Sequence, residues 1–266
     1  MGLQESTART RDIGATLRGV REAAGLSGAA LAHRMGWSAS MVSRIETGRK
    51  YASPAEVATD LGFCRVGSGP LRERLLRLAT DEPTSTRWLE PLETGPSDAV
   101  STVLLHERLA AQITVYDPVA VPGPLRARQR ALTHTRIRAF IPESALRIPH
   151  GDTAARQAQQ RQLVLLDRHS LHIMPGTPPP VPAFELMTFP EFAALVVVQT
   201  PTAILFSEHS ADVQAYQDIV AQLDSVALPD DQSRDLIRRL VDEESGDLYH
   251  HHHPADLVAT ATEMER

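Results

Sequence analysis

The stretch that most constrains the fold of this chain runs from Ser27 to Arg49, with the sequence SGAALAHRMGWSASMVSRIETGR. It predicts two short helices joined by a tight turn at Gly36, because glycine best tolerates the positive φ with which a chain leaves a helix. Ser38 is placed to cap the second helix. The apolar residues that fall at helical spacing and are predicted to form the shared core are Leu31, Met35, Val42 and Ile45.

The outer face of the second predicted helix is small, polar and basic, and it comprises Ser38, Ala39, Ser40, Ser43 and Arg44. A helix that enters the major groove of DNA needs such a face, because bulky or acidic side chains would clash with the phosphate backbone or be repelled by it. The stretch is therefore predicted to be a helix-turn-helix unit whose second helix binds DNA. The alternative is an ordinary helical hairpin in a bundle.

Two basic residues, Arg49 and Lys50, follow the second helix after a turn at Gly48. Side chains at that place lie beside the groove and could hold DNA phosphates, which position a protein on the duplex without reading its sequence. The alternative is that both are solvated surface charges.

The net charge of −6 is divided unevenly along the 266 residues. Residues 1–62 carry eight Lys or Arg and six Asp or Glu residues, a net charge of +2, which leaves −8 for the rest. This asymmetry fits a DNA-binding head on an acidic body that stays off the phosphates. The single cysteine, Cys64, suits a reducing cytosol. No segment approaches the ~20 apolar residues of a membrane span, so a cytoplasmic protein without a membrane partner is expected.

The order of predicted elements indicates an all-α five-helix DNA-binding head followed by an α+β domain. The head spans residues 1–80, with helices at 11–24, in the two halves of the Ser27–Arg49 stretch, at 54–61 and at 69–80. In its first helix, Ile13, Leu17 and Val20 are expected to face inward and Arg18 and Arg21 outward.

Residues 81–97 are rich in Pro, Ser and Thr, and are predicted to be a linker in which Trp88 and Leu89 dock on a neighbour. The α+β domain is predicted at 98–245 and a disordered tail at 246–266. Its helices are expected at 98–110, 142–147, 153–169, 209–226 and 230–243. Its strands are expected at 112–116, 137–141, 171–174, 184–189, 195–199 and 203–206. The outer face of helix 153–169 is predicted to be almost wholly Gln and Arg.

The sequence GATLRGVREAAGLS, followed by LAHRMGWSASMVSRIETGRKYASPAEV, resembles the XRE-type, lambda-repressor-like helix-turn-helix family over residues 11–65. The resemblance implies a five-helix fold in which the recognition helix and its flanking turn bind DNA, and it assigns the same outer-face residues to bases or nearby phosphates. Gly28 stands where the family usually has a DNA-contacting glutamine. Ala30 stands where a glutamate would complete a capping box with Ser27. Both departures imply weaker or differently specified binding.

The phrases VYDPVAVPG, FIPESALR and LHIMPGTPPPVPAFELMTFP make residues 85–243 similar to the C-terminal domain of WhiJ-type regulators, the antitoxin-like transcriptional regulators of actinobacteria. The resemblance implies a DNA-binding regulator that is often encoded beside a small partner protein. One departure follows Gly123, where a helix usual in the family is missing because residues 128–132 lead almost directly into the strand at 137–141.

Motifs of catalysis and cofactor binding are absent: the sequence has no P-loop, no Gly-x-Gly-x-x-Gly after a strand, no Gly-x-Ser-x-Gly and no His-Glu-x-x-His. The chain is accordingly predicted not to be an enzyme and to need no cofactor or metal. Four consecutive histidines, His250–His253, could bind a metal loosely, but they are better explained as part of an unstructured tail. Cys64, in apolar company, is predicted to be a buried structural thiol.

These observations predict a sequence-specific transcriptional regulator that binds double-stranded DNA as a homodimer on a near-palindromic operator, since one short helix gives limited specificity. Two alternatives remain open at this stage. One is an antitoxin-like interaction module that neutralises a small partner protein and regulates its own synthesis. The other is a small-molecule sensor with a pocket between the strands at 171–206 and the helices that cover them.

Overall fold

A computed structural model describes residues 6–80, 86–92, 98–126, 135–147, 153–166 and 169–250. The chain forms two compact units, each built from two segments. The first unit combines Met1–Ile113 with Glu185–Gln217, and the second combines Thr114–Phe184 with Asp218–Arg266. The predicted domain boundaries at 80, 97 and 245 differ from this division and stay a prediction.

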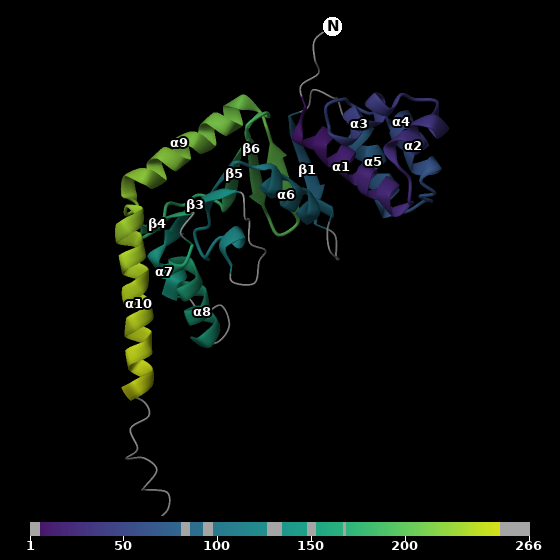
Figure 1. Cartoon of the computed structure of the whole chain (residues 1–266). Coiled ribbons are helices and arrows are strands. Elements are labelled where there is room, and N and C mark those ends of the chain that lie inside the picture. The colour runs from purple at the N-terminus through teal and green to yellow at the C-terminus, as the bar shows by residue number, and fades with distance from the viewer. Residues whose placement is uncertain are drawn as a thin grey trace, which may run out of the picture. The chain divides into compact units, whose positions relative to one another are not determined.

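The helical part of the first unit contains α1 (Ala8–Ala23), α2 (Gly28–Met35), α3 (Ala39–Glu46), α4 (Pro54–Phe63) and α5 (Pro70–Thr80) (Figure 1). Two of these helices begin with a capping box, in which a Thr or Ser side chain and the third helical residue satisfy each other's backbone N–H groups. The caps are Thr7 with Thr10 in α1 and Ser53 with Glu56 in α4. Ile13 and Leu17 are buried, as predicted for the inner face of the first helix.

The rest of the first unit is an antiparallel sheet with α6 (Asp98–Leu109) and the beginning of α9 (Ser210–Val226). Its strands, in spatial order, are β1 (Arg87–Pro91), β7 (Ala203–Ser207), β6 (Leu195–Gln199) and β5 (Phe184–Thr188). Trp88 of β1 lies opposite Phe206 of β7, and their rings stack with centroids 4.7 Å apart. The strand residues at the centre of this sheet are apolar and buried. Strands that are covered on both faces have continuous apolar runs rather than alternating apolar and polar residues.

The second unit contains most of β2 (Gln112–Tyr116), then β3 (Arg136–Pro142) and β4 (Ser170–Met174) in that spatial order, with β3 and β4 parallel. Its helices are η1 (Gly123–Leu125), α7 (Glu143–Arg147), α8 (Thr153–Val164), the end of α9 and α10 (Asp230–His250). The α10 helix packs on α8 and β4. Its Asp230 accepts a hydrogen bond from the backbone N–H of Leu171 at 2.6 Å, and Arg234 donates to the carbonyls of Val164, Leu166 and His169.

A helical N-terminal region followed by a mixed-sheet domain is the predicted arrangement, but several details of the prediction are wrong. Residues 87–91 of the predicted linker form strand β1, because they pair with β7. Trp88 docks as expected, whereas Leu89 stays 58% exposed on the opposite face of the strand. Arg21 is buried rather than outward-facing. The α10 helix reaches His250, inside the predicted tail.

The helix predicted at 153–169 ends at Val164, and part of its Gln-rich side faces inward. Gln157 and Gln160 are buried, and the Gln160 side-chain amide donates to the carbonyl of Leu146 at 3.0 Å. The apparent deletion at residues 128–132 and the run His251–His253 lie outside the described residues. Among the residues that the structure describes, no helix is both long enough and apolar enough to cross a membrane.

Candidate nucleic-acid interface

The two helices of the Ser27–Arg49 stretch are joined by the predicted glycine turn. The α2 helix ends at Gly36, whose φ of 68° lies in the left-handed region, and the N–H of Trp37 then donates to the carbonyl of Ala32 at 2.9 Å. Ser38 caps α3 by accepting a hydrogen bond from the backbone N–H of Met41 at 3.1 Å. Glycine is needed here because a side chain would strain the backbone, and the cap satisfies a helix donor that would otherwise lack a partner.

The start of α2 is capped more simply than the starts of α1 and α4. Ser27 accepts a hydrogen bond from the backbone N–H of Ala30 at 3.1 Å. Ala30 has no side-chain oxygen, so the reciprocal bond of a capping box cannot form. Gly28, likewise, offers no side chain at the position where the resembled family has its glutamine.

A compact apolar core holds α2 and α3 together. Leu31, Ala32 and Val42 are buried, and they form one cluster with Cys64, which is buried as a free thiol. The partly buried side chains that pack on this cluster are Val20, Leu26, Met35, Trp37 and Val66. Ile45 is buried as well. The predicted core of the helical pair is therefore present, with Met35 at its margin.

The opposite face of α3 is exposed, and it carries all five residues predicted to approach DNA: Ser38, Ala39, Ser40, Ser43 and Arg44. Residues three and four apart lie on one side of a helix, so Ser40, Ser43 and Arg44 share a surface. The Nε of Arg44 lies 3.4 Å from the carbonyl oxygen of Ser40, and the residue is exposed. The exposure of these residues is observed, and their contact with DNA stays a prediction.

Helix α1 approaches the end of α3 so closely that only glycine fits at two positions. A Cβ added to Gly14 would lie 2.2 Å from the carbonyl oxygen of Ile45. Gly48, with φ of 69°, would bring a Cβ to 2.7 Å from the backbone of Arg11. The Thr10 hydroxyl also donates to the carbonyl of Gly48 at 2.9 Å. The C-terminal end of α3 is thus held directly on the backbone of α1.

A buried ion pair adds to this attachment. Arg21 of α1 donates to both carboxylate oxygens of Glu46, at 2.6 and 3.0 Å, and to the carbonyl of Leu26 at 2.7 Å. Such a two-bond contact fixes orientation as well as distance. Arg21 therefore positions the last turn of α3, which explains why it faces inward.

The two predicted phosphate-binding residues both meet carboxylates. Arg49 is exposed, and its Nη2 lies 3.1 Å from Oε2 of Glu191, in the segment between β5 and β6. The half-buried Lys50 donates to Glu56 at 3.0 Å. Although partial burial acts in the opposite direction, hydrogen bonds from Ser53 and Lys50 lower the pKa of Glu56. Lys50 is thus tied to the start of α4, whereas Arg49 remains on the surface.

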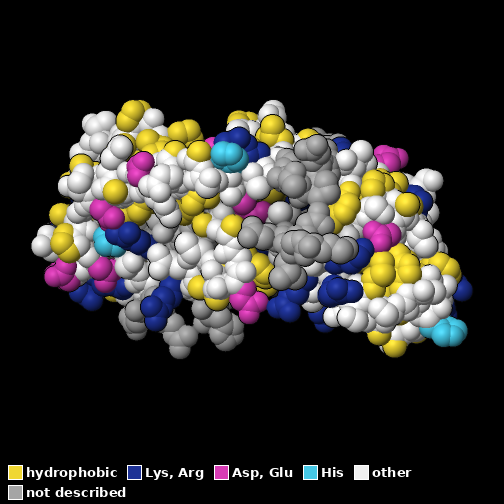
Figure 2. Space-filling model, turned by 90° about the horizontal axis from the view of Figure 1, so that it is seen from above, with side chains coloured by type: hydrophobic (Ala, Val, Ile, Leu, Met, Phe, Trp, Pro, Cys, Tyr) yellow, Lys and Arg dark blue, Asp and Glu magenta, His cyan; other side chains and the backbone are white. Residues whose placement is uncertain are grey.

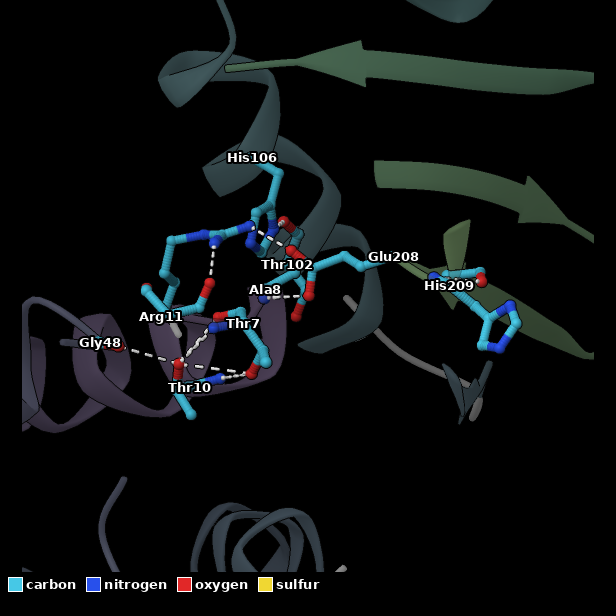
Figure 3. A network of polar contacts seen from close by, with 11 residues as sticks. Thr7, Ala8, Thr10, Arg11, Gly48, Thr102, His106, Glu208 and His209 are labelled. Carbon is cyan, nitrogen blue, oxygen red and sulfur yellow. Dashed lines mark hydrogen bonds and ion pairs between the residues drawn. The ribbon is translucent and has the colours of Figure 1, made fainter. Parts of the chain in front are cut away.

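A second set of buried charges joins α1 to the sheet of the first unit (Figure 3). Arg11 pairs with Glu208 at 3.0 Å, and the other oxygen of Glu208 accepts from the N–H of Ala8 at 2.7 Å. The Arg11 guanidinium lies over the rings of Phe192 and Phe189, 4.3 and 5.2 Å from their centroids. Burial raises the pKa of Glu208 and lowers that of Arg11, and their pairing offsets part of each shift.

The next residue of α1 enters a separate cluster. Asp12 accepts a hydrogen bond from Arg74 of α5 at 2.6 Å, and the same Arg74 nitrogen contacts Thr102 of α6 at 2.9 Å. Arg74 also lies 3.4 Å from the buried Glu90 of β1. Adjacent residues of α1 thus connect the helical part of the first unit to α6 and to the sheet, and the two parts form one compact body.

One face of the protein carries mixed charge. On the face drawn in Figure 2, Lys and Arg side chains are interspersed with Asp and Glu and with apolar side chains, so no large field of one sign covers it. Among the described residues, no group of three or more His, Cys, Asp or Glu side chains could hold a metal ion.

In comparisons with known proteins, two separate segments of the chain each match a protein-family domain. Residues 12–75 match a helix-turn-helix domain. Residues 125–239 match a domain of unknown function, DUF5753. The chain therefore carries an N-terminal helix-turn-helix domain, a class of module that supports the function of a DNA-binding regulator. A search of curated proteins gave no match.

A search of solved structures matched that of TrmBL2, an archaeal chromatin protein described as showing a novel mode of DNA binding. The sequences are 10% identical, the TM-score is 0.33, and the match covers 66% of each chain. The match thus spans slightly less than two thirds of that protein.

The carboxylates that face Arg49 and Lys50 carry no sequence signal that predicts these contacts. Glu191 is 142 residues from Arg49, and no motif links the two. Arg21 could have been found, since it follows Ile13 and Leu17 at intervals of four and therefore lies on the apolar stripe of α1. A charged residue on such a stripe signals a buried partner.

Proposed function

We propose that this protein is a sequence-specific DNA-binding transcriptional regulator that binds an operator as a homodimer. The observation that carries the proposal is the exposed outer face of α3, which is small, polar and basic opposite the buried Val42 and Ile45. Small side chains let a helix backbone approach the base edges, and a single arginine can donate two hydrogen bonds to guanine. An ordinary bundle helix has no need of this combination.

In this proposal the residues divide into two roles. Ser38, Ala39, Ser40, Ser43 and Arg44 face the bases or the nearest phosphates, with Arg44 as the main reader of sequence. Arg49 and Lys50 bind phosphates and set the orientation of the helix. One α3 helix reads only a few base pairs, so two copies on half-sites about 34 Å apart would supply the missing specificity. Binding to the chromosome implies a cytoplasmic protein, and a regulator of this kind needs no enzymatic activity.

The test begins with genome-wide footprinting of the purified full chain on the chromosome of its source organism. A mobility-shift titration on the recovered fragment, at fixed salt, then compares the natural protein with Arg44→Ala. Loss of about 1–3 kcal/mol of specific binding is expected if Arg44 reads a base. Arg18→Ala is the matched control, because Arg18 is an exposed arginine on α1 that pairs with Glu22. Equal affinities for Arg44→Ala and the natural protein would remove Arg44 from the interface.

Two further roles are proposed for residues 98–245, the first of them implied by the resemblance to WhiJ-type, antitoxin-like regulators of actinobacteria. One is binding of a small partner protein encoded nearby, with DNA binding serving autoregulation. The other is binding of a small molecule that changes operator affinity. Co-purification of the full chain with the product of an adjacent short gene tests the first role, and operator binding in the presence of cell metabolites tests the second.

A further inference from the structure

The segment between β5 and β6 reaches the turn that follows the candidate recognition helix. Its residue Glu191 places Oε2 3.1 Å from Nη2 of Arg49, directly after the end of α3. Both side chains are largely exposed, with 63% of Arg49 and 68% of Glu191 accessible. A carboxylate oxygen therefore occupies one of the N–H donors through which this guanidinium could bind a DNA phosphate oxygen.

Glu191 is held near Arg49 by its neighbours in the chain. Phe189 and Phe192 flank it in sequence, and both rings lie against the guanidinium of Arg11. Arg11 is itself buried and paired with Glu208, and its backbone contacts Gly48, the residue before Arg49. The two sides of the contact are thus attached to the same residue of α1, so the Glu191 carboxylate is kept within reach of Arg49.

We propose that Glu191 competes with DNA for Arg49 and so lowers the DNA affinity of the helix-turn-helix domain. This inference rests on the proposed function and adds to it a contact within the protein that lowers DNA affinity. In the free protein Glu191 neutralises Arg49. On the duplex a phosphate replaces the carboxylate, and Glu191 returns to water.

The Arg49–Glu191 pair is weak enough for a DNA phosphate to displace Glu191. An exposed Arg–Glu pair changes an equilibrium by about one- to fivefold, so it can be broken by a competing phosphate. The contact still matters for binding, because every copy of the protein must break it before Arg49 reaches DNA. Lys50 differs, since it is half-buried and its carboxylate partner, Glu56, also caps α4.

The contact predicts a characteristic pattern in a double-mutant cycle. The full-length protein, E191Q, R49Q and the double variant are titrated into a fluorescein-labelled, mixed-sequence duplex of about 30 base pairs, and anisotropy gives Kd at fixed salt. E191Q is expected to bind about two- to fivefold more tightly than the natural protein. R49Q is expected to bind more weakly, with a shallower dependence of log Kd on log salt by about 0.9. In the R49Q background, E191Q should increase DNA affinity only by the small amount expected from removing one negative charge that repels the phosphates.

E22Q is the matched control, because Glu22 forms a comparable exposed pair with Arg18 at 2.8 Å, beside a longer contact to Arg21 at 3.4 Å, and its removal changes the net charge equally. A gain from E191Q no larger than that from E22Q, or an equal gain with and without Arg49, would overturn the competition. If the natural protein binds DNA and either of those two results is obtained, the proposed function is unaffected. If neither the natural protein nor E191Q binds this duplex, the competition fails; the proposed function fails only if the footprinted fragment is not bound either.

Discussion

Gly14→Ala tests the close contact between α1 and α3. The added methyl group should stabilise α1 as an isolated helix, but it should destabilise the folded protein at this contact. Alanine favours a helix interior over glycine by about 1 kcal/mol, so the change would stabilise an isolated α1. In the folded protein the new Cβ would lie 2.2 Å from the carbonyl oxygen of Ile45 and 2.9 Å from the carbonyl carbon of Glu46. These are backbone atoms that cannot rotate away, so the helices must separate by roughly an ångström.

The separation would strain the Arg21–Glu46 pair and the apolar contacts beside it, so the overpacking cost should lie at the upper end of the usual range, about 2–3 kcal/mol. After the helix-propensity gain, Gly14→Ala is expected to lower the free energy of unfolding by about 1–2 kcal/mol. Gly19→Ala is the matched control on the same helix, since its Cβ would meet nothing within 4 Å. It should raise the free energy of unfolding by about 0.5–1 kcal/mol.

Urea unfolding followed by circular dichroism measures both changes. If Gly14→Ala is as stable as the natural protein, or as stable as Gly19→Ala, the close approach of α1 to the end of α3 is wrong. The same variants also connect stability to function. Displacement of α3 should weaken DNA binding by Gly14→Ala, whereas Gly19→Ala should bind as the natural protein does.

Two more perturbations test other parts of the first unit. Burial raises the pKa of Asp60 to about 6, above its usual value, so the folded state binds the extra proton and loses stability as pH rises from about 4 through 6. Asp60→Asn should remove this loss. The free energy of unfolding of the variant minus that of the natural protein should therefore be up to about 2 kcal/mol larger at pH 7.5 than at pH 4. Urea midpoints measure this difference, and parallel pH profiles for the two proteins would contradict the raised pKa. Trp88→Ala should cost about 3–5 kcal/mol because its ring is buried against Phe206, whereas Leu89→Ala on the exposed face should change stability by less than about 0.5 kcal/mol. Equal effects at the two positions in thermal unfolding would mean that residues 87–91 are a linker after all.

Features determined by near neighbours in the chain were predictable. The turn at Gly36 and the cap at Ser38 depend on residues at most five positions apart, so the sequence predicts them directly. The strands at Gln112–Tyr116 and Leu195–Gln199 have the predicted bounds, because dense β-branched and apolar residues favour strands wherever they pair. The exposed face of α3 follows from the same local periodicity, since burial of Val42 and Ile45 turns the intervening residues outward.

The errors arise where distant segments decide the outcome. Arg87–Pro91 lies in a stretch whose proline, serine and threonine content is typical of a linker, and it becomes a strand only through pairing with β7. Gln157 and Gln160 are polar and were expected outside, yet neighbouring elements bury them. Local composition carries no information about such partners.

The sequence by itself therefore determines the helix-turn-helix unit and the residues that it exposes, because capping, turn geometry and helical spacing act over one or two turns of the chain. Only the tertiary structure decides what those residues meet. Arg21 turns inward because Glu46 is there to receive it, and Arg49 faces Glu191 from a segment 142 residues away. Ion pairs of this kind depend on distances in space, and folding brings their partners together regardless of separation along the chain.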